Sequence, residues 1–117
     1  MGMLRTRKAQ NKYLKLIKQG YLSKGCGLCK DHAIKNFKYW KIVDNRFPYN
    51  RIAKVSHMIV PKRHTTENKL NTLEKKEFKS IKRDYLGKKY EYLFENISSK
   101  SIPKHHHLHL IIVRDRI

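Results

Sequence analysis

The chain has 117 residues, which is the size of a single domain. Lysine and arginine number 28 against 9 aspartates and glutamates, so the net charge is +19, and 39% of the residues are hydrophobic. No stretch reaches the roughly 18 apolar residues that would span a bilayer. Because no apolar signal segment follows the basic residues 1–10, we expect a cytoplasmic protein.

The surplus of positive charge has two explanations. It can serve to attract a polyanion such as nucleic acid, a nucleotide or an acidic membrane. It can equally reflect the lysine-rich usage of an AT-rich genome, with the charges solvated. Both explanations leave the protein with a positive field.

Residues 8–22 predict a basic amphipathic helix. Its apolar residues recur at near-helical spacing: Tyr13, Leu14, Ile17, Tyr21 and Leu22. We expect this face to pack on a protein core rather than on a membrane. Residues 1–25 are therefore interpreted as a basic N-terminal helix with its lead-in, and residues 26–117 as the domain proper, in a chain with one domain overall.

The two cysteines, Cys26 and Cys29, lie three residues apart in "GCGLCK". In an intracellular chain this spacing indicates metal binding or redox chemistry rather than a structural disulfide. A thioredoxin-type site would follow a strand and begin a helix. Because a lysine-rich helix and a glycine precede these cysteines, metal binding is the favoured interpretation.

Four later segments have the composition of strands: 37–43, 53–60, 89–97 and 104–113. Residues 44–50, "DNRFPYN", have the chemistry of a turn. Pro61 is expected to end the second strand.

Residues 71–87 predict a long helix. Asn71 and Glu74 have the spacing of a capping box, and Gly87 is the expected stop. The predicted buried stripe consists of Leu73, Phe78, Ile81 and Tyr85. The whole order predicts an α+β fold: an antiparallel sheet with one long helix and the N-terminal helix packed on it.

The last strand, "KHHHLHLIIV", contains four of the histidines. Alternation places His105, His107 and His109 on one face, about 6 to 7 Å apart. His106 lies on the opposite, apolar face. The run is too short and too closely joined to apolar residues to be a terminal tag. A row of imidazoles is suited to metal ligation or to nucleophilic attack on phosphorus, with neighbouring rings as donors.

These residues resemble a known family. The pattern His105-x-His107-x-His109-Leu-Ile is similar to the motif of the histidine triad family of nucleotide hydrolases and transferases. "SHMIVPKRH" (56–64), "DNRFPYN" (44–50) and "FENIS" (94–98) resemble further segments of that family. The resemblance covers residues 26–113 and implies a histidine-triad-like fold and a homodimer.

The resemblance implies a role for individual residues. His107 would attack the α-phosphorus of a nucleotide and form a nucleotidyl-histidine, which water opens. His109 would donate to the phosphate and assist the leaving group, and His57 would be a further active-site histidine. Substrate contacts would come from Asn45 at the ribose, Asn96 at the sugar-phosphate and Ser101 at the phosphate. A histidine at 109 favours the hydrolases over the transferases, which carry glutamine there.

Zinc-containing relatives imply one structural Zn²⁺ per chain, held by Cys26, Cys29, His64 and His105, with His32 as a substitute ligand. Two alternatives stay open. One is a basic nucleic-acid-binding module with a finger-like zinc site of Cys26, Cys29, His57 and His64. In that module the stacking platforms would be Tyr39, Trp40, Phe47 and Tyr49. The other is a non-catalytic nucleotide sensor.

Overall fold

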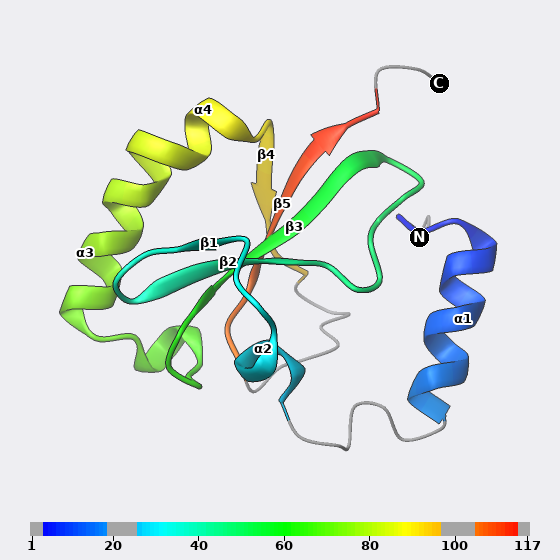
Figure 1. The fold of residues 1–117 in the computed structure, drawn as a ribbon, viewed down its shortest axis with the longest axis horizontal. Coiled ribbons are helices and arrows are strands. Elements are labelled where there is room, and N and C mark those ends of the chain that lie inside the picture. The colour runs from blue at the N-terminus through cyan, green and yellow to red at the C-terminus, as the bar shows by residue number, and fades with distance from the viewer. Residues whose placement is uncertain (1–3, 19–25, 97–104, 115–117) are drawn as a thin grey trace.

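A computed structural model of the protein describes residues 4–18, 26–96 and 105–114, and these form an α+β fold (Figure 1). The helical elements are α1 (Arg7–Lys18), α2 (Gly27–Lys30), η2 (Glu67–Lys69), α3 (Thr72–Ile81), the π-helical η3 (Lys82–Leu86) and α4 (Gly87–Lys89). The strands are β1 (Lys35–Asn36), β2 (Trp40–Asp44), β3 (Ala53–Pro61), β4 (Tyr92–Phe94) and β5 (Leu108–Val113). The predicted fold class is confirmed at this level.

The strands form one antiparallel five-stranded sheet with the order β1-β2-β3-β5-β4. The central strand β3 places Ile59 opposite Ile42 of β2 and opposite Leu108 of β5. Next to that pair in β5, Met58 lies opposite His109 and His57 opposite Leu110. Because residues directly opposite share a face, this register assigns His57 and His109 to different sides of the sheet.

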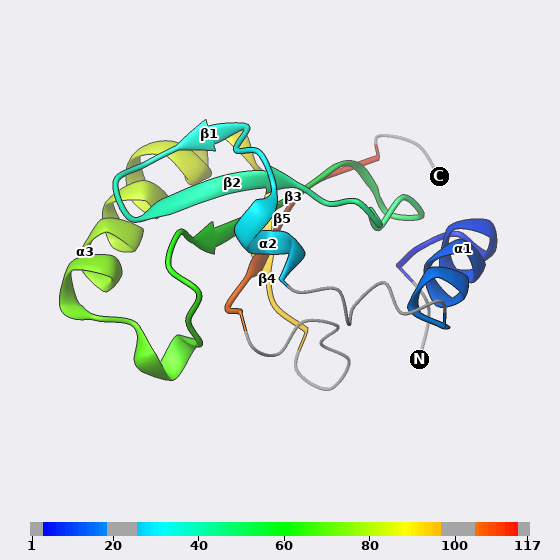
Figure 2. The same ribbon diagram turned by 60° about the horizontal axis from the view of Figure 1, so that its bottom comes forward.

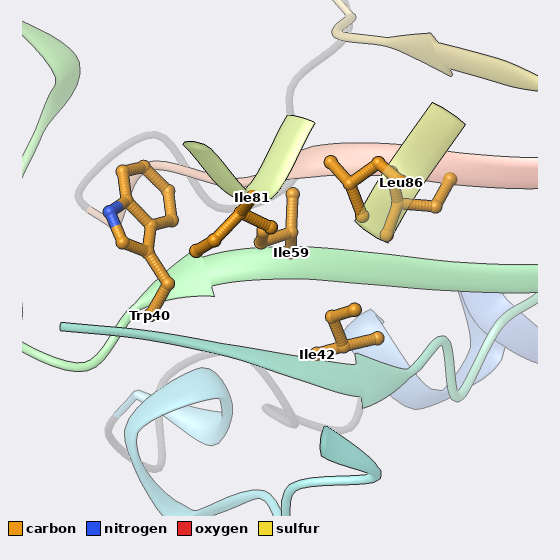
Figure 3. Close-up of a cluster of buried hydrophobic side chains, with 6 residues drawn as sticks. Trp40, Ile42, Ile59, Ile81 and Leu86 are labelled. Atoms are coloured by element: carbon orange, nitrogen blue, oxygen red, sulfur yellow. The ribbon is translucent and has the colours of Figure 1, made fainter. Parts of the chain in front are cut away.

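One side of the sheet packs against α3 and η3, and we call it the α3 face. Its buried cluster consists of Trp40, Ile42, Ile59, Ile81, Leu86 and Leu110 (Figure 3). Ile81 of α3 and Leu86 of η3 lie over the sheet residues of this cluster. Trp40 contacts Phe78 of α3 at a ring-centroid distance of 4.9 Å and donates its indole N–H to the Glu74 carbonyl. Burial of these side chains holds the long helix against the sheet.

The start of α3 matches its prediction, and its end does not. Asn71 accepts from the Glu74 backbone N–H, and the Glu74 carboxylate accepts from the Asn71 backbone N–H. Leu73, however, is 56% exposed and does not belong to the buried stripe. Gly87 is helical, with a φ of −64°, and does not stop the helix. The wider π turn brings Leu86 onto the same face as Ile81, five residues earlier, which a regular helical period would not do.

The opposite side of the sheet, the α2 face, carries a smaller core. Leu28 of α2 packs with Val43, Met58 and Val60, and Cys26 lies at its margin. Figure 2 shows α2 against the middle of the sheet. The cysteine segment is thus held on the face that also receives His109.

Helix α1 lies at the far end of the molecule from α3 (Figures 1 and 2). It was expected to pack on the sheet, but within the described residues α1 and the residues just before it contact the β2–β3 loop. Tyr13 packs against Phe47 at 4.7 Å, Arg5 donates to the Phe47 carbonyl, and the Thr6 backbone N–H donates to Asn50. Predicted over 8–22, the helix is seen over Arg7–Lys18, and residues 19–25 lie outside the described part.

The strand boundaries also differ from the prediction. β5 begins at Leu108 instead of 104, so His105–His107 form the approach to the strand. β4 is limited to Tyr92–Phe94 of the predicted 89–97, and Pro61 is the last residue of β3. Among the described residues, no helix is both long enough and apolar enough to cross a membrane.

Candidate functional site

Two cysteines and two histidines meet at the edge of the α2 face: Cys26, Cys29, His64 and His105. Their ligand atoms all lie within 4.8 Å of one another. The Nδ1 atom of His105 lies 3.2 Å from the Cys26 sulfur and 3.4 Å from the Cys29 sulfur, and His64 Nδ1 lies 3.3 Å from the Cys29 sulfur. These four residues could hold a metal ion.

The spacing of the four atoms fits a tetrahedral ion. With metal–sulfur bonds of about 2.3 Å and metal–nitrogen bonds of about 2.0–2.1 Å, the ligand atoms would be about 3.5 Å apart. His105 is fully buried, and its Nε2–H donates to the Pro61 carbonyl at 2.9 Å. That bond leaves the lone pair on Nδ1, the atom that faces both sulfurs, as in metal sites whose ligands are oriented by a second contact.

Three separate segments supply these ligands. The single turn α2 carries Cys29 and follows Cys26, the chain after β3 carries His64, and the approach to β5 carries His105. His32 is exposed and is not part of the cluster, so the structure does not use it as a substitute ligand. The finger-like set that includes His57 is not brought together either.

Burial, with a further contribution from Cys26, raises the pKa of Cys29, and burial lowers the pKa of His105. A bound cation would favour the Cys29 thiolate and so would counteract the raised pKa of Cys29. The lowered pKa of His105 suits metal binding, because metals bind neutral imidazole.

His107 and His109 follow directly, with ring centroids 5.4 Å apart and nearly perpendicular planes. The Nδ1–H of His107 donates to the carbonyl oxygen of His105 at 3.0 Å. The proton of the neutral ring therefore lies on Nδ1, and Nε2 keeps the lone pair. The expected proximity of His107 and His109 is present, while the third odd-numbered histidine, His105, is turned to the two cysteines and His64.

His109 is 3% exposed and lies among aromatic rings. Phe94 stacks on it at 5.2 Å, and the Tyr49 hydroxyl lies 3.3 Å from its Nε2. Burial, reinforced by His107 and Arg5, lowers the pKa of His109 to about 3. The ring is consequently neutral at any physiological pH.

His57, expected with the triad, lies on the α3 face. Its Nδ1 is 2.7 Å from the hydroxyl of Tyr90, and its sheet partner is Leu110. Burial lowers the pKa of His57, and burial raises that of Tyr90 to about 12. The sheet separates His57 from His109, so the structure does not bring it into the triad. His106 also faces the α3 side, where its ring meets Trp40 edge-on.

Of the three residues predicted to contact substrate, only Asn96 lies beside His109 in the described part of the structure. Asn45 is buried and accepts from the Phe47 backbone N–H, so it shapes the β2–β3 loop. Asn96 donates to the Tyr49 hydroxyl at 2.6 Å, which places it beside His109. Ser101 lies outside the described residues.

Sequence reasoning missed Tyr49 and Phe94 as partners of His109. Tyr49 was considered only as a stacking platform, but at 4% exposure it is not available for stacking, and neither is the buried Trp40. Tyr49 and His109 are 60 positions apart. No local pattern signals such a pair, because the sheet and the β2–β3 loop create it.

No model of a known protein family matches the chain, and no curated protein matches it.

Proposed function

We propose that the protein is a nucleotide-binding hydrolase or nucleotidyl transferase of the histidine triad type, with hydrolysis favoured. The observation that carries this proposal is the His107 ring. Its Nδ1–H is held by the His105 carbonyl and its Nε2 keeps the lone pair, which is the protonation state that a nitrogen nucleophile requires. The positive net charge would attract the phosphates of the substrate.

The reaction has two steps. Nε2 of His107 attacks the α-phosphorus of a nucleoside phosphoramidate, dinucleoside polyphosphate or adenylylated substrate, and a phosphorus–nitrogen bond forms as the bond to the leaving group breaks. The leaving group departs with the electron pair and takes up a proton from solvent, and the hydrolytic step later returns one proton from the attacking water. The ring of the nucleotidyl-histidine is cationic, and the His105 carbonyl stabilises its Nδ1–H. Water then adds to phosphorus and releases the nucleoside monophosphate and neutral His107.

We assign one structural zinc ion per chain to Cys26, Cys29, His64 and His105, because two thiolates and two imidazoles are a usual tetrahedral set for zinc. When bound, the ion supplies a fixed cross-link. His105 contributes its ring to the cluster and its carbonyl to His107, so the cluster holds the group that orients the nucleophile.

The test is turnover of a fluorogenic adenosine phosphoramidate. His107→Ala should abolish turnover, and His32→Ala, which changes an exposed histidine outside the site, should not. Wild-type protein quenched in alkaline denaturant, which preserves a phosphorus–nitrogen bond, should carry a nucleotidyl mass that His107→Ala lacks. Undiminished turnover in His107→Ala would overturn the proposal. Light scattering would test the homodimer that the resemblance implies.

Nucleic-acid binding is a second candidate function, and α1 favours it. Within Arg7–Lys18 there is no acidic residue, and Arg7, Lys8, Lys12 and Lys15 are exposed. Such a helix can neutralise phosphates along a strand. Binding of single-stranded DNA should weaken steeply as salt rises, should survive His107→Ala, and should weaken in a Lys12→Gln, Lys15→Gln variant. Binding unaffected by both salt and these substitutions would exclude α1 as the surface.

A further inference from the structure

A chain of side-chain hydrogen bonds ends at a buried nitrogen of His109. The Asn96 side-chain amide donates to the Tyr49 hydroxyl at 2.6 Å, and that hydroxyl lies 3.3 Å from His109 Nε2. The other ring nitrogen, Nδ1, is buried and has no hydrogen-bond partner among the described residues. A buried polar nitrogen without a partner is costly in a folded protein, so it indicates a group that joins it on binding.

The direction of this chain follows from the chemistry of its members. Because Asn96 donates to the Tyr49 oxygen, the Tyr49 proton must point to another acceptor, and His109 Nε2 is within reach. Burial raises the pKa of Tyr49, so its hydroxyl keeps that proton. Neutral imidazole has one donor and one acceptor nitrogen. If Nε2 accepts, Nδ1 must carry the hydrogen.

We propose that Tyr49, oriented by Asn96, is a positioning residue that holds the proton of His109 on Nδ1, and that this buried N–H binds a non-bridging oxygen of the substrate phosphate. That the acceptor is a phosphate oxygen rests on the proposed function. The position of the hydrogen on His109 Nδ1 does not depend on it. Asn96 then acts through Tyr49 and not by touching the sugar-phosphate. His109 acts as a neutral donor to developing charge and does not give up a proton.

The surroundings of His109 keep this arrangement in place. Tyr49 is tilted against the His109 ring at 4.7 Å, and Phe94 covers the ring. The Arg5 guanidinium lies 4.7 Å from the centre of the Tyr49 ring and 4.5 Å from that of Tyr13. These contacts limit rotation of Tyr49, and the nearby positive charge of Arg5 disfavours a charged imidazolium at His109.

Nitrogen-15 NMR of the histidine side chains tests the tautomer directly, since the two ring nitrogens differ in chemical shift when one carries hydrogen. Wild-type His109 should show hydrogen on Nδ1, and Tyr49→Phe should shift the population toward hydrogen on Nε2. Tyr90→Phe is the matched control, because it removes the hydroxyl beside His57 on the other face. It should change the His57 signals and leave those of His109 unaltered.

Two further measurements address the ligand. Adenosine monophosphate should shift the His109 Nδ1 signal in the wild type and less in Tyr49→Phe. Turnover of the phosphoramidate should fall in kcat by about tenfold in Tyr49→Phe, less than the roughly hundredfold cost of deleting such a donor, with KM nearly constant.

Hydrogen on His109 Nε2 in the wild type, or an unchanged tautomer in Tyr49→Phe, would overturn the proposal whether or not the protein is an enzyme. The expected tautomer with no response of His109 to adenosine monophosphate would overturn the phosphate contact. The expected tautomer in a protein that binds adenosine monophosphate and turns over nothing would support this inference and remove the proposed catalysis.

Discussion

Glu74 is the buried carboxylate that joins the start of α3 to the sheet. It accepts from the Asn71 backbone N–H and from Arg63 at 2.7 Å, and its own carbonyl accepts from Trp40. The Arg63 hydrogen bond lowers the pKa of Glu74 below its ordinary 4.5. A carboxylate with a lowered pKa stabilises the fold above its ordinary pKa, and the contribution is lost as the pH falls through the lower value.

We therefore expect Glu74→Gln to lower the free energy of unfolding at pH 7 by about 1–3 kcal/mol, since charged hydrogen bonds to a buried group are lost. The difference from the wild type should shrink below pH 4.5. Urea unfolding followed by fluorescence of the single tryptophan, Trp40, would measure it. Glu67→Gln, in the exposed η2 turn, is the control and should have little effect. A loss of equal size at pH 4 and pH 7 would contradict this reasoning.

His57 and His109 allow a second prediction at this scale, because both are histidines of the sheet but on different faces. His109→Ala should reduce phosphoramidate turnover by about a hundredfold, through loss of a donor to the phosphate. His57→Ala should retain turnover in protein that circular dichroism shows to be folded. Comparable losses of kcat in both variants would mean that His57 acts in catalysis across the sheet.

At the scale of elements, α1 lies at the end of the molecule away from α3 and packs on the β2–β3 loop. Helices of this length are marginal in isolation. Here a few contacts with the β2–β3 loop hold it: Tyr13 packs against Phe47, and Arg5, just before the helix, donates to the Phe47 carbonyl. We therefore expect α1 to unfold separately from the sheet, at a lower free-energy cost than global unfolding.

Tyr13→Ala should release α1 and speed tryptic cleavage after Lys8, Lys12 and Lys15, while Trp40 fluorescence keeps its native spectrum. The reason is that Tyr13 is buried on the loop, whereas the cleavage sites are already exposed. Leu14→Ala, at a neighbouring residue that is 51% exposed, is the control and should leave the cleavage rate nearly unchanged. Loss of the Trp40 signal together with α1 would show instead that the two unfold as one unit.

At the scale of the whole molecule, the cluster of two cysteines and two histidines brings the α2 segment, which lies outside the sheet, together with the ends of the paired strands β3 and β5. Cys26 and Cys29 are separated from His105 by most of the chain, and His64 follows the central strand. A domain of this size has a limited core. A metal cross-link there would add its binding energy to the folding energy.

Elemental analysis should find about one zinc per chain, and a strong chelator should lower the melting temperature by many degrees. Acidification should release the ion, because thiolates and neutral imidazoles must take up protons as the pH falls. Cys29→Ser should abolish binding and the effect of the chelator, whereas His32→Ala should preserve both. A metal-free protein with an unchanged melting temperature would exclude the cross-link.

The sequence by itself determined the fold class, most strand positions, the capping box at Asn71 and Glu74, and the closely spaced pair Cys26 and Cys29 as candidate metal ligands. These are local signals: alternation, helical period, cap chemistry and ligand spacing, each expressed within a few residues.

Only the tertiary structure decided where α1 docks, that Gly87 stays helical, and that His57 and His109 occupy opposite faces. It also decided that Tyr49 reaches His109 across 60 positions of sequence. The physical reason is that strand register and long-range packing assign each side chain to a face, and a shift of one residue reverses that assignment.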